Sequence, residues 1–520
     1  MAGQHRFDFG TVPLGTHWAD ALADAVIAQK RGESLYTCAA GISPSGPVHF
    51  GNFRDIITAH AVVEALQKKG KNARTLFSWD NFDRLRKVPA GVSESFSEHI
   101  GKPLSKVPDP LGELPSYAAR FEAPFVEALA TLGIPIEYRD ETALYEAGTY
   151  DSQIFLALQK REAIADILLS FMTEKGKGEK GIVPEKYRTE YYPISLYSRF
   201  TGKDNTKILS YDGGTKVTYY CADSKNTEEV DLAKDHIAKL AWKIDWPMRW
   251  KHEGVSFEPG GHDHASPGGS YDVASVIAEK IFSYDPPVFA EYKFVGIQGL
   301  GAKMSGSKGN AVTPLELLEI YEPELLKWMY LRKSPDQSFS LAFDSEIYRQ
   351  YDEYDLEVSA PAGKHAIPFR QAVGFGQIVG WQEDKLAELL AGMSLSYDRE
   401  SIKTRTPRAR TWLNTHNPAE RIELLEHSND SYAQQLSKDS RARIVKLKNA
   451  LSSEGRESIA DLEALVYEIP KEGLVGELKV AQRNFFKDVY NLLIGKDTGP
   501  RLGTFLWAAN RERVMHLLDM

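Results

Sequence analysis

The chain has few of the features that mark secreted or membrane-spanning proteins. It contains two cysteines, Cys38 and Cys221, which are too few for a disulfide framework or for a zinc site built from cysteine alone. No apolar run is long enough to cross a bilayer, and residues 1–20 lack the charged and apolar segments of a secretory signal. We therefore expect a cytoplasmic protein that spans no membrane and holds no structural zinc.

Basic residues are fewer than acidic ones, 63 lysines and arginines against 72 aspartates and glutamates. The formal net charge is −9, so any contact with nucleic acid would have to use local basic patches on an acidic body. Of the 520 residues, 42% are hydrophobic and 26% are charged, as in ordinary globular proteins, and no internal repeat stands out. A chain of this length is too long to fold around one hydrophobic core, so we expect several domains.

The stretch 35–79 predicts a strand, a turn, a helix and a second strand. Leu35–Ala40 is a short apolar run, Arg54–Lys69 repeats apolar residues at helical spacing, and Ala73–Trp79 again has strand character. Between the first strand and the helix lies a turn rich in proline and glycine, Pro44–Asn52. Such a turn at a helix N-terminus offers backbone N–H groups, an imidazole and an amide to a phosphate.

A second polar loop, Lys303–Asn310, follows the apolar run Val288–Ile297, which we expect to be the last strand of the sheet. Taken alone, either loop has an ordinary explanation: relief of backbone strain by Gly46 and Gly51, or a solvated lysine-rich surface. Together and in this order, Pro44–Asn52 and Lys303–Asn310 resemble the "HIGH" and "KMSKS" signature sequences of class I aminoacyl-tRNA synthetases.

The resemblance implies adenylate formation, in which a carboxylate attacks the α-phosphate of ATP and pyrophosphate leaves. Catalysis then rests mainly on positioning and on stabilising charge at the phosphoryl oxygens. His49 and Asn52 can donate hydrogen bonds to phosphate, and Lys303 and Lys308 can bring positive charge on a closing loop. Gly306 stands where the second motif has its second lysine, so Lys308 is expected to replace the missing cation.

The turn Gly261-His262-Asp263 resembles the Gly-x-Asp element of the same class, whose aspartate accepts hydrogen bonds from ribose hydroxyls. His262 and His264 could instead form a metal pair, but no third ligand lies at a convincing spacing and no metal site is expected. The resemblance predicts as ATP-binding residues Pro44, Ser45, Gly46, His49, Gly51, Asn52, Gly261, Asp263, Lys303, Met304 and Ser305.

Five stretches extend the resemblance to the class I lysyl-tRNA synthetases over nearly the whole chain. They are Gly41–Gly46, Ser78–Pro89, Trp242–Trp250, Gly261–Asp272 and Lys303–Asn310. That family implies an α/β fold, with a Rossmann-type parallel-sheet catalytic domain, a connective insertion, and an all-α C-terminal anticodon-binding domain of the α-helix cage type. It also implies L-lysine, ATP and tRNA(Lys) as substrates, Mg²⁺ with the ATP, a lysyl-adenylate intermediate, and stimulation of activation by bound tRNA.

The same resemblance predicts a lysine pocket at the end of the first strand. Ser43 stands where threonine is usual in the family, so the hydroxyl is kept and a methyl group is lost. The substrate ammonium needs a carboxylate, and the sequence leaves open which of Asp80, Asp83 and Asp263 supplies it. Core packing remains an alternative for Trp242. The predicted lysine-binding residues are Gly41, Ser43, Asp80, Trp242, His264 and Tyr271.

Changes of pattern along the chain predict its organisation. We expect a helix over Asp231–Lys243, and only helical periodicity in the C-terminal third. The predicted domains are the first half of the Rossmann domain at 1–90, the insertion at 91–227, the second Rossmann half at 228–300, a region with the second motif and stem contacts at 301–350, and the anticodon-binding domain at 351–520.

Two basic clusters in the helical region, Lys403–Arg410 and Arg441–Lys448, are candidate contacts for tRNA phosphates. A solvated helix face is the alternative for either cluster taken alone. The predicted tRNA-binding residues are Arg405, Arg408, Arg410, Arg443 and Lys446. The chain is expected to act as a monomer.

Two other interpretations stay open. The first is a class I synthetase for another amino acid, such as glutamate or cysteine, although the scarcity of cysteine disfavours zinc-dependent selection of cysteine. The second is a catalytically silent relative that binds RNA as a regulator. The presence of His49, Asn52, Asp263 and Lys303 argues against the silent relative.

Overall fold

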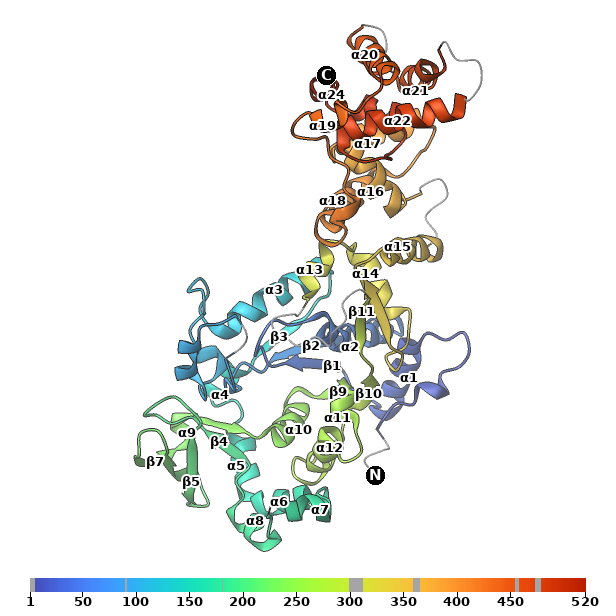
Figure 1. Ribbon diagram of the computed structural model, residues 1–520. Coiled ribbons are helices and arrows are strands. Elements are labelled where there is room, and N and C mark those ends of the chain that lie inside the picture. The colour runs from blue at the N-terminus through green and yellow to red at the C-terminus, as the bar shows by residue number, and fades with distance from the viewer. Residues whose placement is uncertain are drawn as a thin grey trace. The chain divides into compact units, whose positions relative to one another are not determined.

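The computed structural model describes residues 5–88, 91–179, 181–298, 312–358, 365–453, 458–472 and 478–520 (Figure 1). The chain forms two compact units, the first from Met1–Leu318 with Leu326–Leu341 and the second from Glu319–Leu325 with Ala342–Met520. The chain thus enters the second unit, returns to the first, and then enters the second again. The predicted loop Lys303–Asn310 lies outside the described residues.

The first unit is built on a five-stranded sheet in which all neighbouring strands are parallel, in the order β10-β9-β1-β2-β3. The strands are β1 (Tyr36–Ile42), β2 (Ala73–Trp79), β3 (Glu137–Asp140), β9 (Val255–Gly261) and β10 (Val288–Tyr292). The chain adds β2 and β3 on one side of β1 and later returns to add β9 and β10 on the other. Ligands bind where the strand order reverses in this way, beyond the carboxyl ends of the strands. This sheet confirms the predicted parallel α/β fold class.

Helices cover both faces of the sheet, because successive strand residues point to opposite faces and both faces are apolar. Ala39 of β1 and Leu76 of β2 pack on Trp246 and Trp250 of α10. Helix α2 contacts β1, β2 and β9, and Figure 1 shows α2 and α10 on opposite sides of the sheet. These helices are α1 (Trp18–Gln29), α2 (Phe50–Lys68), α3 (Tyr117–Thr131), α10 (Trp242–Glu253), α11 (His262–Ala265) and α12 (Ser270–Lys280).

Between β3 and α10 the chain forms a further group of elements around a second hydrophobic cluster. Its helices are α4 (Glu141–Glu146), α5 (Asp151–Gln159), α6 (Arg161–Ser170), α7 (Glu174–Glu179), α8 (Pro184–Glu190) and α9 (Leu232–Asp235). Strand β4 (Ile194–Leu196) pairs antiparallel with β8 (Ala238–Leu240). Antiparallel strands β5 (Thr206–Tyr211), β6 (Lys216–Cys221) and β7 (Thr227–Asp231) form a three-stranded sheet.

The helix predicted over Asp231–Lys243 is wrong. Only α9 and the first residues of α10 are helical there, and β8 lies between them because its backbone pairs with β4, far away in the sequence. In addition, β3 lies within 91–227, so the core sheet takes one strand from the stretch predicted as the insertion. The five-part division of the chain remains a prediction.

Two short strands and two helices follow β10 in the chain. Strand β11 (Val295–Gln298) pairs with β12 (Phe339–Ala342), and α13 (Pro314–Leu318) and α14 (Pro323–Leu331) lie between them in sequence. Helix α13 contacts α2 and α3 of the first unit.

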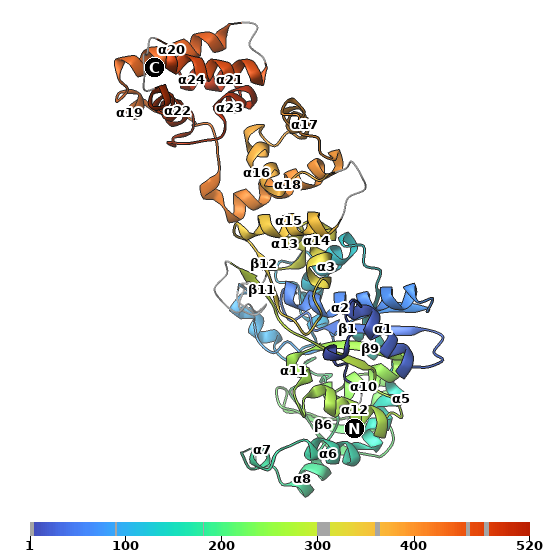
Figure 2. The ribbon, with the colours of Figure 1, turned by 90° about the vertical axis from the view of Figure 1, so that its right-hand side faces the viewer.

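Beyond Ala342, the described part of the second unit contains helices and no strand, as predicted for the C-terminal region (Figure 2). Leu447, Phe485 and Leu506 belong to its hydrophobic cluster. The helices are α15 (Glu346–Glu357), α16 (Phe369–Ile378), α17 (Glu383–Gly392), α18 (Arg399–His416), α19 (Asp430–Ala433), α20 (Lys438–Ser452), α21 (Ile459–Glu468), α22 (Leu478–Ile494), α23 (Leu502–Ala508) and α24 (Arg511–Leu517). Among the described helices of both units, none has the length and apolar character needed to cross a membrane.

Candidate active site

The turn between β1 and α2 ends in His49, which caps the N-terminus of α2. Its Nδ1 accepts a hydrogen bond from the backbone N–H of Gly51 at 3.1 Å. A Cβ at position 51 would lie 2.8 Å from the imidazole, so only glycine lets the ring fold over the helix end. Burial lowers the pKa of His49 from its ordinary value, which keeps the ring neutral near pH 7. With Nδ1 accepting, we assign the ring hydrogen to Nε2, which is then a donor at the helix N-terminus.

The rest of the turn is held by contacts with neighbouring elements. The hydroxyl of Tyr117 on α3 donates to the carbonyl of Ser45 at 2.9 Å, and Pro44 is buried. Gly46 is half-buried, and the backbone N–H of Asn52 donates to the His49 carbonyl at 2.9 Å. The turn is therefore fixed against α3 before any ligand binds.

A cavity of about 510 Å³ opens at the carboxyl ends of β1, β2 and β9. The lining of this cavity brings together seven residues predicted for the ATP and lysine sites: Gly41, Ser43, Asn52, Asp80, Trp242, Gly261 and His264. A Cβ at Gly41 would lie 3.1 Å from the Ser78 carbonyl, so glycine allows β1 and β2 to approach closely here. Burial lowers the pKa of His264 from its ordinary value, which favours a neutral ring in this wall.

Other predicted residues lie elsewhere. Tyr271 does not line the cavity, so its predicted place in the lysine pocket is wrong: its ring is fully buried and stacks on Phe289, and its hydroxyl donates to the Pro287 carbonyl at 2.9 Å. Asp263 is exposed on α11 and is not part of the cavity lining. The predicted residues Lys303, Met304, Ser305 and Lys308 lie outside the described part of the chain.

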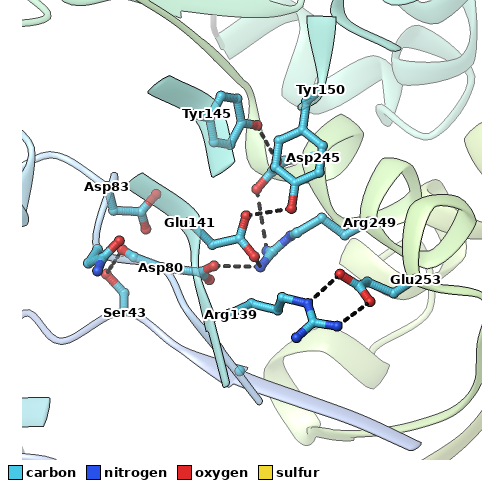
Figure 3. A network of polar contacts seen from close by, with 12 residues as sticks. Ser43, Asp80, Asp83, Arg139, Glu141, Tyr145, Tyr150, Asp245, Arg249 and Glu253 are labelled. Carbon is cyan, nitrogen blue, oxygen red and sulfur yellow. Dashed lines mark hydrogen bonds and ion pairs between the residues drawn. The ribbon is translucent and has the colours of Figure 1, made fainter. Parts of the chain in front are cut away.

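Arg249 of α10 contacts three acidic side chains beside the cavity: Asp80, which follows β2, Glu141 of α4 and Asp245 of α10 itself (Figure 3). Its Nη1 lies 2.6 Å from Asp80 and 3.4 Å from Glu141, and its Nη2 lies 3.3 Å from Asp245. Lys239 adds a second cation, 3.2 Å from Asp245. Burial alone would raise the pKa of Asp245, but Lys239 and Arg249 outweigh it and hold that pKa below its ordinary value. The network therefore already supplies Asp80 with a cation.

Trp242 is tied to the same network. The Arg249 guanidinium lies 5.4 Å from the Trp242 ring centroid, and the Trp242 ring stacks on Trp246 with centroids 5.0 Å apart. A neighbouring pair, Arg139 and Glu253, is joined by two hydrogen bonds of 2.7 and 3.1 Å (Figure 3). The Trp242 ring in the cavity wall is therefore held by a charged group, Arg249, as well as by aromatic stacking.

Asp55, which the sequence reasoning missed, also lines the cavity. One oxygen accepts from the backbone N–H of Gly41 at 3.4 Å, and the Tyr292 hydroxyl also hydrogen-bonds to the carboxyl group. No cation pairs with Asp55 among the described residues. Burial and the nearby Glu258 raise the pKa of Asp55 well above its ordinary value, and burial raises the pKa of Glu258 to about 7. An uncompensated carboxyl pair of this kind favours a cationic ligand.

Two signals in the sequence point to these carboxyls. Asp55 follows Asn52 by three residues on α2, so both side chains lie on the same face of the helix. Glu258 precedes Gly260 by two residues on β9, which places both on one face of the strand. Each spacing could have been read without the structure.

The cavity lining holds more acidic than basic side chains. Six carboxyl groups and four cationic side chains line it, the acids being Asp55, Asp80, Asp83, Asp204, Glu253 and Glu258 and the bases Arg84, Arg86, Lys239 and Arg249. Several acids have basic partners, whereas Asp55 and Glu258 have none among the described residues. The carboxyl groups without a basic partner therefore lie at the Asp55 end.

The model of the family "tRNA synthetases class I (K)" matches residues 16–366, which include the whole cavity. The chain belongs to the class I lysyl-tRNA synthetases. A lysine–tRNA ligase of Streptomyces coelicolor is 37% identical to it over 97% of this chain and 98% of that protein. Lysine–tRNA ligases of Thermococcus kodakarensis and Treponema pallidum are 33% and 32% identical, each over 97% of this chain, and over 99% and 98% of their own lengths.

The chain is less similar to proteins of known structure than to these relatives. A glutamate tRNA ligase from Elizabethkingia meningosepticum, solved in complex with its amino acid, aligns with a TM-score of 0.47 and 11% sequence identity over 94% of this chain and 99% of that chain. This likeness is too low to bear on the site. The family resemblance expected from the sequence is confirmed by the sequence matches.

In this member of the family, the predicted tRNA contacts of the second unit differ in accessibility. Arg405 is buried, 2.6 Å from Asp355 and 3.0 Å from Glu322, so the prediction that it contacts phosphate is wrong: both carboxylates already occupy its guanidinium. Arg408 is half-buried and donates to two backbone carbonyls.

Three predicted tRNA contacts keep access to solvent in this synthetase. Arg410 is exposed and Arg443 is half-buried. Lys446 is exposed and forms an ion pair with Glu472. These side chains lie on α18 and α20.

The described residues hold no group of three or more histidine, cysteine, aspartate or glutamate side chains able to bind a metal ion. Cys221 is buried, and its Sγ lies 3.9 Å from the hydroxyl of Thr201. That the chain holds no structural zinc stays a prediction from its sequence.

Proposed function

We propose that this chain is a lysine–tRNA ligase, which activates L-lysine with ATP and transfers the lysyl group to tRNA(Lys) for translation. Membership of the class I lysyl-tRNA synthetases supports this activity. The observation that carries the proposal is Asp55, a carboxyl group without a cation in the lining of a cavity that also includes Asn52 of the phosphate-binding turn. One cavity therefore offers a partner to an ammonium group and a donor to a phosphate.

The amino-acid end of the site is the region of Asp55 and Tyr292. A substrate ammonium there would gain a charge-assisted hydrogen bond to a half-buried carboxylate that has no other cation among the described residues. Asp80 is a weaker candidate for the same role, because Arg249 lies 2.6 Å from it. Ser43, whose hydroxyl lies 3.5 Å from the Asp80 carbonyl, and Gly41 are proposed to contact the rest of the lysine.

The ATP end is the turn that begins α2. The Nε2–H of His49 and the amide of Asn52 are proposed to donate to the phosphoryl oxygens, aided by the N-terminus of the helix. Gly261 and Asp263 are proposed to contact the ribose, and Lys303 and Lys308 to close over the triphosphate. Mg²⁺ is expected to arrive with ATP and to neutralise part of the phosphate charge.

The reaction follows from this placement in two steps. The lysine carboxylate attacks the α-phosphorus, the bond to the bridging oxygen of pyrophosphate breaks, and lysyl-adenylate forms. A hydroxyl of the terminal adenosine of tRNA then attacks the lysyl carbonyl carbon, loses its proton, and AMP leaves. Neither step needs a side-chain nucleophile, so positioning and charge stabilisation supply the catalysis. We further propose that Arg408, Arg410, Arg443 and Lys446 contact tRNA and that the enzyme acts as a cytoplasmic monomer.

Pyrophosphate exchange tests this function directly. Each of the 20 amino acids would be assayed with ATP and labelled pyrophosphate, with and without total tRNA. We expect exchange with lysine alone, stimulated by tRNA, followed by charging of tRNA(Lys). Exchange with a different amino acid, or none under any condition, would overturn the proposal.

His49→Ala tests the ATP end separately. Loss of a donor that acts on the developing charge should lower the exchange rate by roughly 10²–10³-fold. Lysine affinity, measured by calorimetry, should stay within about twofold. His49→Gln, which keeps an N–H donor, should recover part of the rate. Equal losses of rate and of lysine affinity in His49→Ala would show that the ring is structural.

A further inference from the structure

Glu141 is an acidic side chain behind the cavity wall to which the activity proposed above gives no role. It begins α4, is fully buried, and does not line the active-site cavity. Its two carboxylate oxygens have different partners. Oε1 lies 3.4 Å from Nη1 of Arg249, and Oε2 accepts a hydrogen bond from the Tyr150 hydroxyl at 3.0 Å. Glu141 is therefore held between Arg249 and Tyr150, as Figure 3 shows.

Charge pairing in this buried network does not require Glu141. Three other carboxylates already pair with its two cations, Arg249 and Lys239. They belong to Asp80, Asp83 and Asp245. A fourth buried carboxylate costs free energy, because burial and the neighbouring acids disfavour its charged form. Costly ionisable groups of this kind concentrate at functional sites, so Glu141 is a candidate for a functional role.

Arg249 connects Glu141 to the cavity wall. Its Nη1 is shared between Glu141 and Asp80, and its Nη2 faces Asp245. Its Nε is buried and has no hydrogen-bond partner in the described part of the chain. The orientation of the guanidinium therefore depends on the acids at its two Nη atoms. The same guanidinium lies 5.4 Å from the ring centroid of Trp242, so a change in its orientation would reach that ring.

Asp80 and Trp242 connect Arg249 to the lysine pocket. Both side chains line the cavity. The backbone N–H of Asp80 donates to the Ile42 carbonyl at 2.9 Å, and the Ser43 hydroxyl lies 3.5 Å from the Asp80 carbonyl. A shift of Arg249 would therefore disturb the end of β1, where Ser43 is proposed to contact lysine, together with the aromatic wall of the same cavity.

We propose that Glu141 is a positioning residue for lysine, because it fixes the orientation of Arg249 and, through Arg249, that of Asp80 and Trp242. The inference rests on the proposed function, which assigns lysine to this cavity. The phosphate-binding turn is held by a different contact, the hydrogen bond from Tyr117, so the effect should be confined to the amino acid. The stretch between β3 and α10 thus supports lysine binding through a group that does not touch the substrate.

The test compares Glu141→Gln with the wild type in lysine-dependent pyrophosphate exchange at pH 8, with total tRNA present. Burial raises the pKa of Glu141 to about 7, so the wild-type carboxylate is ionised at this pH. Glutamine keeps the shape of the side chain and an oxygen for the Tyr150 hydroxyl, but it lacks the charge that holds Arg249. Glu146→Gln is the matched control, since Glu146 is exposed on the same helix and pairs with Lys106.

Glu141→Gln should raise the KM for lysine about tenfold and leave both kcat and the KM for ATP within about twofold. Its midpoint of thermal unfolding should equal or exceed that of the wild type, because no buried cation loses its last partner. Tyr150→Phe, which removes only the hydrogen bond to Glu141, should raise the same KM by a smaller factor. Glu146→Gln should change none of these quantities.

Four outcomes would overturn the inference. They are unchanged kinetics in Glu141→Gln, a lower kcat with an unchanged KM for lysine, equal losses for lysine and ATP, and a midpoint of thermal unfolding several degrees below that of the wild type. The last three would show that Glu141 only maintains the fold. If the wild type itself showed no lysine-dependent exchange, the proposed function would fail instead.

Discussion

Asp55 lies in an environment that is unfavourable for a charged carboxylate. It is a carboxyl group near Glu258, and no cation pairs with it among the described residues. Such an arrangement costs stability wherever the carboxyl is ionised, and a bound ammonium group would recover that cost. Two predictions at the scale of single residues follow from this environment.

Asp55→Asn should affect binding and stability in opposite directions. Loss of the charged partner should weaken lysine binding about 100-fold, while ATP affinity stays within about twofold. Without ligand, at a pH high enough to ionise Asp55, the midpoint of thermal unfolding should rise, because the variant no longer holds an uncompensated charge there. Calorimetry and thermal scans measure both, with Glu64→Gln on the same helix as the control, since Glu64 lies outside the cavity. A variant that loses both stability and lysine affinity would show a structural role for Asp55.

Lysine affinity should rise with pH. Burial raises the pKa of Asp55 well above its ordinary value and that of Glu258 to about 7, so both carboxyls hold protons in acidic solution. The proton on Asp55 must leave before an ion pair with the substrate ammonium can form. The dissociation constant should therefore fall as pH rises toward the raised pKa of Asp55, by up to tenfold per pH unit below that pKa. Titration calorimetry at several pH values checks this, and the dependence should flatten in Asp55→Asn. An affinity independent of pH would contradict the assignment.

At the scale of elements, the link between β2, α3 and α4 depends on two polar side chains. Asn81, just after β2, donates to Glu122 on α3 at 3.3 Å and accepts from the backbone N–H of Thr142 on α4 at 2.9 Å. Burial raises the pKa of Glu122 from 4.5 to about 7. The loop that carries Asp80 and Asp83 therefore sits beside a carboxyl group that changes charge near neutral pH.

Glu122→Gln should reduce the loss of stability at high pH. Because the folded protein holds the Glu122 proton more tightly than the unfolded chain does, its contribution is fully present below about pH 4.5 and is lost as pH rises through about 7. The amide can still accept from Asn81. Relative to wild type, the variant should therefore gain on the order of 1 kcal/mol at pH 8 and nothing at pH 4.5, in urea unfolding. Glu127→Gln, exposed on the same helix, is the control. An equal effect at both pH values would contradict the mechanism.

Within the second unit, two arginines of α18 should behave differently. Arg405→Met leaves Glu322 and Asp355 without their buried cation and should cost about 3–5 kcal/mol of unfolding free energy in that unit. Arg410→Met, at an exposed position, should change stability by less than about 0.5 kcal/mol. It should instead weaken tRNA binding and reduce the slope of log K against log salt by about 1. Equal stability losses, or an unchanged salt slope in Arg410→Met, would count against this division.

Elements were predictable from the sequence where local pattern and tertiary packing agree. β1 was predicted from the apolar run 35–40, and α2 from the helical spacing of apolar residues between 54 and 69. Both predictions succeeded because each element buries its apolar residues in the core around the sheet. Asp231–Lys243 has helical spacing, but β8 forms there because β4 supplies backbone partners from more than 40 residues away. No local pattern contains that information.

The candidate site was predictable to the same limited extent. Asn52 follows from the turn and Gly41 and Ser43 from the family resemblance, and the structure places all three in the cavity lining. The prediction for Tyr271 failed because the sequence does not distinguish an aromatic residue that lines a cavity from one that packs in the core behind it. Asp55 was missed because, on a helix read for its apolar face, a single acid resembles a solvated position. Deciding either case requires knowing which way α12 and α2 face.

At the scale of the whole molecule, each unit has a hydrophobic cluster of its own, and the cavity belongs to the first unit. Calorimetric unfolding should therefore show two transitions. Lysine at about 100 times its dissociation constant should stabilise the first unit by about 2.7 kcal/mol and raise its transition by a few degrees, leaving the other unchanged. Asp55→Asn should abolish that shift. A single transition that moves as a whole under lysine would show that the units unfold together.

The route of the chain between its two units limits how the protein can be divided. A fragment that begins at Ala342 omits Glu322, one of the two carboxylates on Arg405, and Tyr321, whose hydroxyl receives the N–H of Ala342 and donates to Gln350. A fragment that begins at Glu319 restores these groups but carries 326–341, which belongs to the other unit. The helical unit is therefore compact in space but not contiguous in sequence. Its exchange between relatives by recombination would require breakpoints on both sides of 326–341, which a single crossover cannot provide.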